Sequence, residues 1–263
     1  MRGGINYRIG VISMATNYTY ESHSYAGKTL HIIKTDASNI RLLNLLGQKT
    51  LPASGYYGVN GGFFSTHMLN VVMNAGGPIG PRLTISDGRT IVDGSGIEYN
   101  GEGIVGWTGA SMFAQHGVHY ASNVSGASSE SSWAQGGYSM FIGDARWLSK
   151  LKTECSGYSL PSHYLDSRTR TVLVANLSLK KVYLISSAVG SNFTWETMRA
   201  AVQDYLGIQD STTNFYENTI KGLFLDGGSS TQMYCKNNSG GTISIMDSTK
   251  RPLYEIIALK KTT

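Results

Sequence analysis

Charged residues are scarce in this 263-residue chain, because Asp, Glu, Lys and Arg together make up only 15% of it, against about a quarter in an average domain. Proline is rare too, with 5 residues, whereas glycine reaches 32 and tyrosine 16. This composition argues against a helical cytosolic protein and favours a β-rich, turn-rich protein of the secreted or virion-borne kind. We therefore expect an extracellular or virion-associated protein of phage or bacterial origin.

Apolar runs are short throughout the chain, so we expect no segment that spans a membrane, and residues 1–20 contain no sustained signal-peptide-like region. We also expect no nucleic-acid partner, because the net charge of +5 is not gathered in clusters with interleaved aromatics. A mildly basic surface suits an anionic polymer or a phosphate-bearing substrate. The densest basic group lies near the C-terminus and consists of Lys250, Arg251, Lys260 and Lys261.

Cysteine and histidine give no indication of a metal centre. Cys155 and Cys235 lie far apart in the chain and match no zinc or redox spacing, so they form either one disulfide or two buried thiols. Gly117 lies between His116 and His119 and argues against the helix that would place both imidazoles on one zinc ion. We expect ordinary surface or core histidines here.

The apolar pattern predicts an α+β fold with mixed or antiparallel sheets and a few packed helices, because strands dominate and strict β-α-β alternation is missing. We expect residues 1–49 to form N-terminal strands packed on a main domain of residues 50–263, together making one compact unit. The leucines of residues 42–46 fit either a short helix or a buried strand. The expected strands cover residues 5–13, 28–36, 171–175, 182–186, 222–226 and 253–260.

One helix is clearly marked in the sequence. Thr194 can cap its start, Glu196 suits the positive end of the helix dipole, and Gly207 can end it. In contrast, the Ser- and Gly-rich stretch of residues 121–136 is typical of a surface loop. The apolar stripe of the helix consists of Trp195, Met198, Val202, Tyr205 and Leu206.

The segment Leu225-Asp226-Gly227-Gly228-Ser229-Ser230-Thr231 follows a short apolar strand and is the most unusual part of the chain. Paired glycines lose much conformational entropy on folding, so they indicate a backbone that bends sharply or lies close to another group. Asp226 is therefore either the hydrogen-bonding anchor of a tight loop or a functional carboxylate.

Two further polar segments also adjoin predicted strands. The turn Asn60-Gly61-Gly62-Phe63-Phe64 has a second glycine pair, which suggests that two strand ends converge on one polar site. Arg168 and Arg170 precede the predicted hairpin, and their planar forks match phosphate or carboxylate oxygens. Alternatively, they are surface arginines with Asp166 as their counter-ion.

The order of these segments resembles that of the phosphodiester glycosidase family over roughly residues 50–260. It runs from the Asn-Gly-Gly turn, through an Arg-Thr pair before a strand and a Thr-led helix, to the Asp-Gly-Gly loop. Ser229 stands where the family usually has a third glycine. Arg170-Thr171 continues with Val-Leu-Val rather than the family's small-apolar-Gly, and we take Arg170 as the matching arginine, with Arg168 as the alternative.

This resemblance implies a hydrolase that cleaves the glycosidic bond of a sugar-1-phosphodiester. A phosphodiester is a good leaving group, so one carboxylate with cationic groups can suffice where most glycosidases use two carboxyls. Asp226 is then the expected nucleophile or base, Arg170 with Arg168 binds the phosphate, and Asn60 orients sugar hydroxyls or water. The other expected substrate-binding residues are Gly61, Gly62, Gly227, Gly228, Ser229 and Ser230, with the amides of Gly227 and Gly228 forming an anion nest.

Three alternatives remain open at this point. Asp226 and Asn60 offer oxygen ligands for a divalent cation such as calcium or magnesium. A Ser-His-Asp triad using Ser229 or Ser230 is a weaker alternative, since no Gly-x-Ser-x-Gly elbow is present. A non-catalytic glycan-binding module of a phage tail or secreted bacterial protein would use tyrosine and tryptophan faces instead. For the enzyme, we expect a cell-surface glycopolymer such as teichoic acid as the substrate.

Overall fold

The computed structural model describes residues 17–62, 133–154, 164–213 and 219–260, together with the backbone of short strands between residues 64 and 121. The predictions for residues 5–13, His116, Cys155 and much of the 121–136 loop fall outside these ranges. Cys235 is a buried free thiol. None of the described helices is long and apolar enough to cross a membrane.

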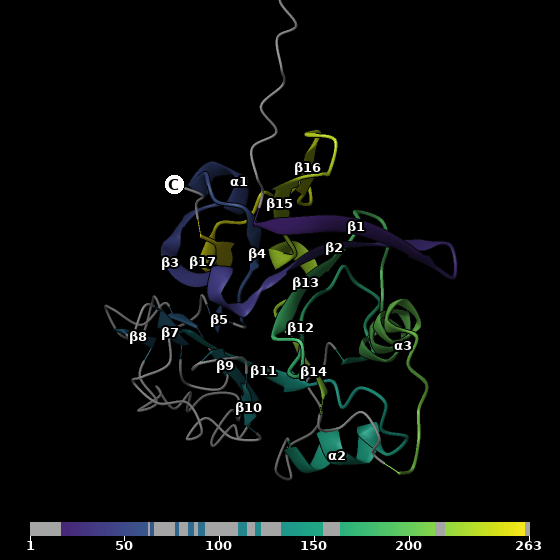
Figure 1. The fold of residues 1–263 in the computed structure, drawn as a ribbon. Coiled ribbons are helices and arrows are strands. Elements are labelled where there is room, and N and C mark those ends of the chain that lie inside the picture. The colour runs from purple at the N-terminus through teal and green to yellow at the C-terminus, as the bar shows by residue number, and fades with distance from the viewer. Residues whose placement is uncertain are drawn as a thin grey trace, which may run out of the picture.

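The described part of the chain forms two large antiparallel sheets and three α-helices, which confirms the predicted α+β fold (Figure 1). The strand order of the larger sheet is β1 (Tyr18–Tyr25), β2 (Lys28–Asp36), β13 (Lys181–Ser187), β12 (Thr171–Asn176), β14 (Ile220–Phe224), β11 (Trp133–Ser139), β7 (Thr84–Ser86) and β8 (Arg89–Val92). β9 (Ala110–Ala114) pairs with β11 and with β10 (His119–Ala121).

The smaller sheet has the order β16 (Thr242–Ile245), β15 (Met233–Lys236), β4 (Gly58–Asn60), β17 (Leu253–Leu259) and β3 (Ile40–Lys49). β5 (Phe64–Ser65) and β6 (Gly77–Pro78) form a separate pair. The helices are α1 (Leu51–Ser54), α2 (Trp147–Glu154) and α3 (Trp195–Leu206). The leucines of residues 42–46 thus belong to a strand.

Several predicted elements are confirmed by the structure. β12 and β13 form the expected antiparallel hairpin, and β2 covers residues 28–36 as predicted. α3 begins after Thr194, whose hydroxyl accepts a hydrogen bond from the backbone N–H of Thr197, and it ends at Gly207 in the left-handed conformation. β2 pairs with β13 and β3 pairs with β17, so the N-terminal strands are hydrogen-bonded into both sheets.

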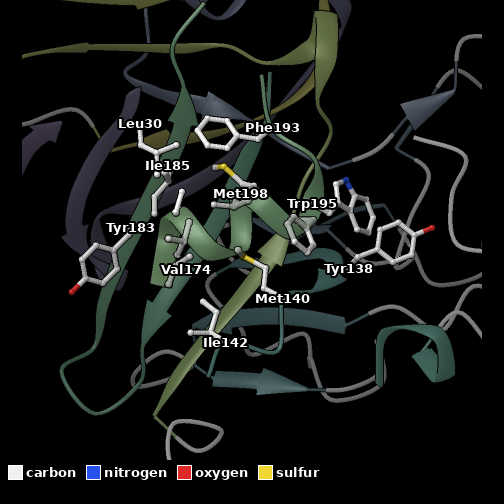
Figure 2. Packing of buried hydrophobic residues seen from close by; sticks show 14 of the residues in the cluster. Leu30, Tyr138, Met140, Ile142, Val174, Tyr183, Ile185, Phe193, Trp195 and Met198 are labelled. Atoms are coloured by element: carbon white, nitrogen blue, oxygen red, sulfur yellow. The ribbon is translucent and has the colours of Figure 1, made fainter. Parts of the chain in front are cut away.

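The core has two parts, one on each face of the larger sheet. Leu173 and Ala175 of β12 lie in the cluster between the sheets, whereas Val172 and Val174 lie in the cluster beneath α2 and α3. Burial on both faces explains why β12 is apolar at successive positions rather than alternating. Figure 2 shows Val174 near the α3 side chain Met198, and Figure 1 shows α3 and β17 on opposite sides of β12.

Candidate functional site

The Asp226 loop lies at the end of β14, beside the start of β12. These strands are antiparallel, and the backbone N–H of Leu225 donates to the carbonyl of Thr171 across 3.0 Å. The Trp195 ring stacks on Phe224, the last residue of β14, with centroids 4.5 Å apart. This packing fixes the end of the strand from which Asp226 follows.

Two hydrogen bonds join the loop to the segment before β12. The Gly228 N–H donates to the Thr169 carbonyl across 2.8 Å, and the Thr169 hydroxyl donates to the Gly228 carbonyl across 2.9 Å. Thr169 lies between the two candidate arginines in the sequence. The structure therefore brings the predicted arginine segment and the Asp-Gly-Gly loop together.

Asn60 reaches the same place from the smaller sheet, at the end of β4. Its amide Nδ2 donates to the Asp226 carbonyl across 2.9 Å and to the Gly61 carbonyl across 3.2 Å. The Asp226 N–H in turn donates to the Gly61 carbonyl across 3.4 Å. The expected convergence of the two strand ends is confirmed.

The Asn60 side chain is 1% exposed and uses its full hydrogen-bonding capacity within the protein. Its Oδ1 accepts from the Thr171 hydroxyl across 2.6 Å and from the Gln232 N–H across 3.1 Å. With both Nδ2 hydrogens also engaged, no group of this side chain is left for a sugar or a cation. The Asn60 side chain thus connects the smaller sheet to β12 and the Asp226 loop of the larger sheet through hydrogen bonds.

The glycine pair after Asp226 allows close approach to an arginine. A Cβ on Gly227 would lie 3.0 Å from the Thr169 carbonyl oxygen and 3.3 Å from Arg170 Nη1, and Gly228 has a φ of +61°. The Gly227 N–H donates to Asp226 Oδ1 across 2.9 Å, and the Gly228 N–H is engaged by Thr169. These two amides therefore do not form the predicted anion nest.

The glycine pair after Asn60 makes room for two buried polar side chains. A Cβ on Gly61 would lie 2.8 Å from Glu255 Cγ, and one on Gly62 would lie 2.9 Å from Gln135 Nε2. Glu255 and Gln135 are both buried. Close packing against these two side chains is a structural reason for glycine at both positions.

Arg170 is buried, with 2% of its surface exposed, and its side chain is tied to backbone carbonyls. Nε donates to the Phe193 carbonyl across 2.9 Å, and Nη2 donates to the Asp166 carbonyl. Burial lowers the pKa of Arg170 to about 10, helped by the charge of Arg168 and opposed by Asp166 and Asp226. The guanidinium therefore remains charged at neutral pH, next to the Asp226 loop.

Arg168 lies at the surface of the same region, and 54% of its side chain is exposed. Its Nη2 pairs with Asp166 Oδ2 at 2.6 Å, as the counter-ion alternative predicted. A Cβ on Gly228 would lie 3.5 Å from Arg168 Cδ, so the stem of this arginine lies beside the loop. An incoming anion thus meets Arg168 more readily than Arg170.

The Asp226 carboxyl is partly buried, and burial raises its pKa to about 6. Opposing this rise are the nearby Ser230 hydroxyl, the Gly227 N–H and the positive charges of Arg251 and Arg170. The Ser230 hydroxyl is fully buried and approaches the carboxyl without the geometry of a full hydrogen bond. A carboxyl that titrates near neutrality beside cationic groups is typical of a functional site.

Arg251 was not among the predicted site residues. Its Nη1 donates to the Ser229 hydroxyl across 3.3 Å, and its backbone carbonyl accepts from Gln232 Nε2 across 2.7 Å. In the sequence it appeared only as part of a basic group near the C-terminus. No local motif marks it, because its contact with the loop arises from the packing of the segment before β17.

The residues described at this site offer few ligands for the divalent cation that the sequence left open as an alternative. Among the described residues, no group of three or more His, Cys, Asp or Glu side chains is placed to hold one metal ion. The Oδ1 of Asn60, which was the expected partner of Asp226, already accepts two hydrogen bonds. Calcium usually takes six or more oxygen ligands. Asp226 and Asn60 together supply far fewer than that.

The fold resembles that of a known enzyme domain. Over 94% of this chain and 83% of the other, it is similar to the catalytic domain of zebrafish N-acetylglucosamine-1-phosphodiester alpha-N-acetylglucosaminidase, auto-inhibited by its pro-peptide, with a TM-score of 0.58 and 13% identity. A predicted exported protein of Burkholderia pseudomallei matches over 89% of this chain and 74% of its own, with a TM-score of 0.55 and 12% identity. A hypothetical protein from Synechocystis matches over 92% of this chain and 61% of its own, with a TM-score of 0.51 and 14% identity. No protein-family model and no curated protein sequence matches the chain.

Proposed function

We propose that the protein is a hydrolase that cleaves the glycosidic bond of a sugar-1-phosphodiester, with Asp226 acting at the anomeric carbon. The observation that carries this proposal is the position of the Asp226 carboxyl, at the junction of two sheets and beside arginines. The likeness of the fold to the zebrafish glycosidase domain supports the reaction class. That the sugar belongs to a cell-surface glycopolymer stays a prediction.

In this proposal the two arginines before β12 have different roles. The exposed guanidinium of Arg168 contacts the phosphate of the substrate, whereas buried Arg170 supplies a fixed positive charge behind the loop. Asn60 positions the loop and does not touch the sugar. Arg168 therefore takes the phosphate-binding role that the sequence assigned mainly to Arg170.

Asp226 must be ionised to act as a nucleophile or as a base. With a pKa of about 6, roughly nine-tenths of the molecules carry the carboxylate at about pH 7. As the bond between the anomeric carbon and the phosphodiester oxygen breaks, its electron pair stays on that oxygen. Asp226 either forms a bond to the anomeric carbon, giving a glycosyl ester that water then hydrolyses, or takes a proton from the water that attacks this carbon directly. The phosphate leaves as an anion, so no second carboxyl is needed to protonate it.

Hydrolysis of a model sugar-1-phosphodiester in water labelled with heavy oxygen tests the reaction class. We expect the label in the released sugar, because the bond to the anomeric carbon breaks. Label in the phosphate product would identify a phosphodiesterase and contradict the proposal. Binding of the substrate without any product would instead show a glycan-binding module.

A further inference from the structure

Three successive residues of the Asp226 loop lie next to three different arginines. A Cβ added to Gly227 would lie 3.3 Å from Arg170 Nη1, and one added to Gly228 would lie 3.5 Å from Arg168 Cδ. The Ser229 hydroxyl accepts a hydrogen bond from Arg251. Arg170 and Arg168 precede β12 of the larger sheet. Arg251 precedes β17 of the smaller sheet, so the loop lies next to arginines from both sheets.

The outer side of this turn is open to solvent. Ser229 and Arg251 are partly exposed, and Arg168 is largely exposed. Arg168 and Arg251 flank successive residues of one turn, the short 3-10 helix Gly228–Ser230. An anion that binds over Gly228 and Ser229 therefore lies near the side chains of two arginines.

The charges around the turn suit a monoanion. The charged side chains described around the turn are three arginines and two aspartates. They are Arg168, Arg170, Arg251, Asp226 and Asp166. When Asp226 is ionised, this set has one positive charge in excess. A phosphodiester carries one negative charge and balances it, whereas a neutral glycoside does not.

We propose that Arg251 is a substrate-binding residue that, together with Arg168, binds the phosphate group over the Gly228–Ser230 turn. Its hydrogen bond to Ser229 orients the guanidinium toward the turn, and it reaches the turn from the smaller sheet, whereas Arg168 reaches it from the larger sheet. This inference rests on the proposed function for the identity of the natural ligand. The anion site itself can be tested without any turnover.

Calorimetric titration with inorganic phosphate is the direct test, on the wild-type protein and on Arg251→Gln, Arg251→Lys and Lys250→Gln. We expect Arg251→Gln to weaken phosphate binding about tenfold or more, because a charge-assisted hydrogen bond is lost. Arg251→Lys keeps the charge without the planar fork and should retain part of the affinity. Lys250→Gln removes an exposed positive charge from the adjacent residue and should leave the affinity unchanged.

The kinetic counterpart is a rise in KM for the sugar-1-phosphodiester in Arg251→Gln, by a similar factor and with a smaller change in kcat. Unchanged phosphate affinity in Arg251→Gln would overturn the inference, as would an equal loss in Lys250→Gln or no phosphate binding by the wild-type protein. Circular dichroism confirms that each variant is folded. If phosphate binding depends on Arg251 while no phosphodiester is hydrolysed, the proposed function fails and the anion site stands.

Discussion

The side-chain amide of Asn60 donates a hydrogen bond to the backbone carbonyl of Asp226 across 2.9 Å, joining the end of β4 in one sheet to the loop after β14 in the other. This bond holds the backbone of Asp226 and leaves its carboxyl to face Gly227, Ser230 and the arginines. The position of the proposed reactive group thus depends on a side chain whose hydrogen bonds are all made within the protein.

Replacing Asn60 by Ala should lower the free energy of unfolding by about 2–4 kcal/mol, because it leaves buried partners such as the Thr171 hydroxyl unsatisfied. We expect kcat to fall as well, since the Asp226 carbonyl loses its hydrogen bond from the Asn60 side chain. Asn238→Ala is a matched control, because this exposed asparagine also makes two hydrogen bonds, both to the backbone of Tyr20. Denaturant unfolding measures both variants, and equal stability losses would contradict the role of Asn60.

The two arginines before β12 should respond differently to replacement by Gln. Arg170→Gln removes a buried charge and its bonds to the Phe193 and Asp166 carbonyls, so we expect a loss of about 2–4 kcal/mol in unfolding free energy. Arg168→Gln breaks only an exposed ion pair and should change stability by less than about 1 kcal/mol. Its effect should be a higher KM for the phosphodiester. A stability loss in Arg168→Gln as large as that in Arg170→Gln would refute this division.

Gly227→Ala tests whether the loop requires close contact with Arg170. The added Cβ meets Thr169 and Arg170 at 3.0–3.3 Å, so we expect the guanidinium to shift and kcat to fall at least about tenfold. Gly240→Ala is the control for backbone strain alone, because Gly240 has a φ of +84° and no atom within 4 Å of an added Cβ. That variant should lose about 1 kcal/mol of stability and no activity. Full activity of Gly227→Ala would show that the contact is dispensable.

Stability should depend on pH through Asp226. Its pKa is raised from 3.8 to about 6 in the folded protein, so the folded state binds this proton more tightly than the unfolded state. Stability from this group is present below about pH 4 and is lost as pH rises through about 6. Relative to Asp226→Asn, the wild-type protein should therefore lose up to about 3 kcal/mol between about pH 4 and pH 7. Urea unfolding of both proteins checks this, and a wild-type advantage that grows with pH would contradict the raised pKa.

The sequence predicts those elements whose signals are local. The Thr194 cap, the stripe on α3 and the terminal Gly207 define one helix without any tertiary information, and the hairpin of β12 and β13 is equally well marked. The meeting of Asn60 with Asp226 was also predicted, from two glycine-paired turns at strand ends. In contrast, β16 is only four residues long and has a single buried residue, so its pattern is too short to identify it.

The parts of the site that sequence could not predict depend on contacts between distant segments. Whether the Asn60 amide is free or saturated depends on Thr171 and Gln232, which lie on other elements. The contact between Arg251 and Ser229 requires the packing of the smaller sheet against the loop. The role of the glycine pairs likewise becomes visible only once their neighbours are placed.

The most direct test of the proposed function compares hydrolysis of a model sugar-1-phosphodiester by the wild-type protein and by Asp226→Asn. The two side chains are nearly the same size, and the amide oxygen of Asn can still accept the bond from the Gly227 N–H. We predict that the wild-type protein releases the sugar and that Asp226→Asn, folded by circular dichroism, is slower by about a thousandfold or more. Undiminished hydrolysis by Asp226→Asn would contradict the assignment of Asp226 as the reactive carboxylate.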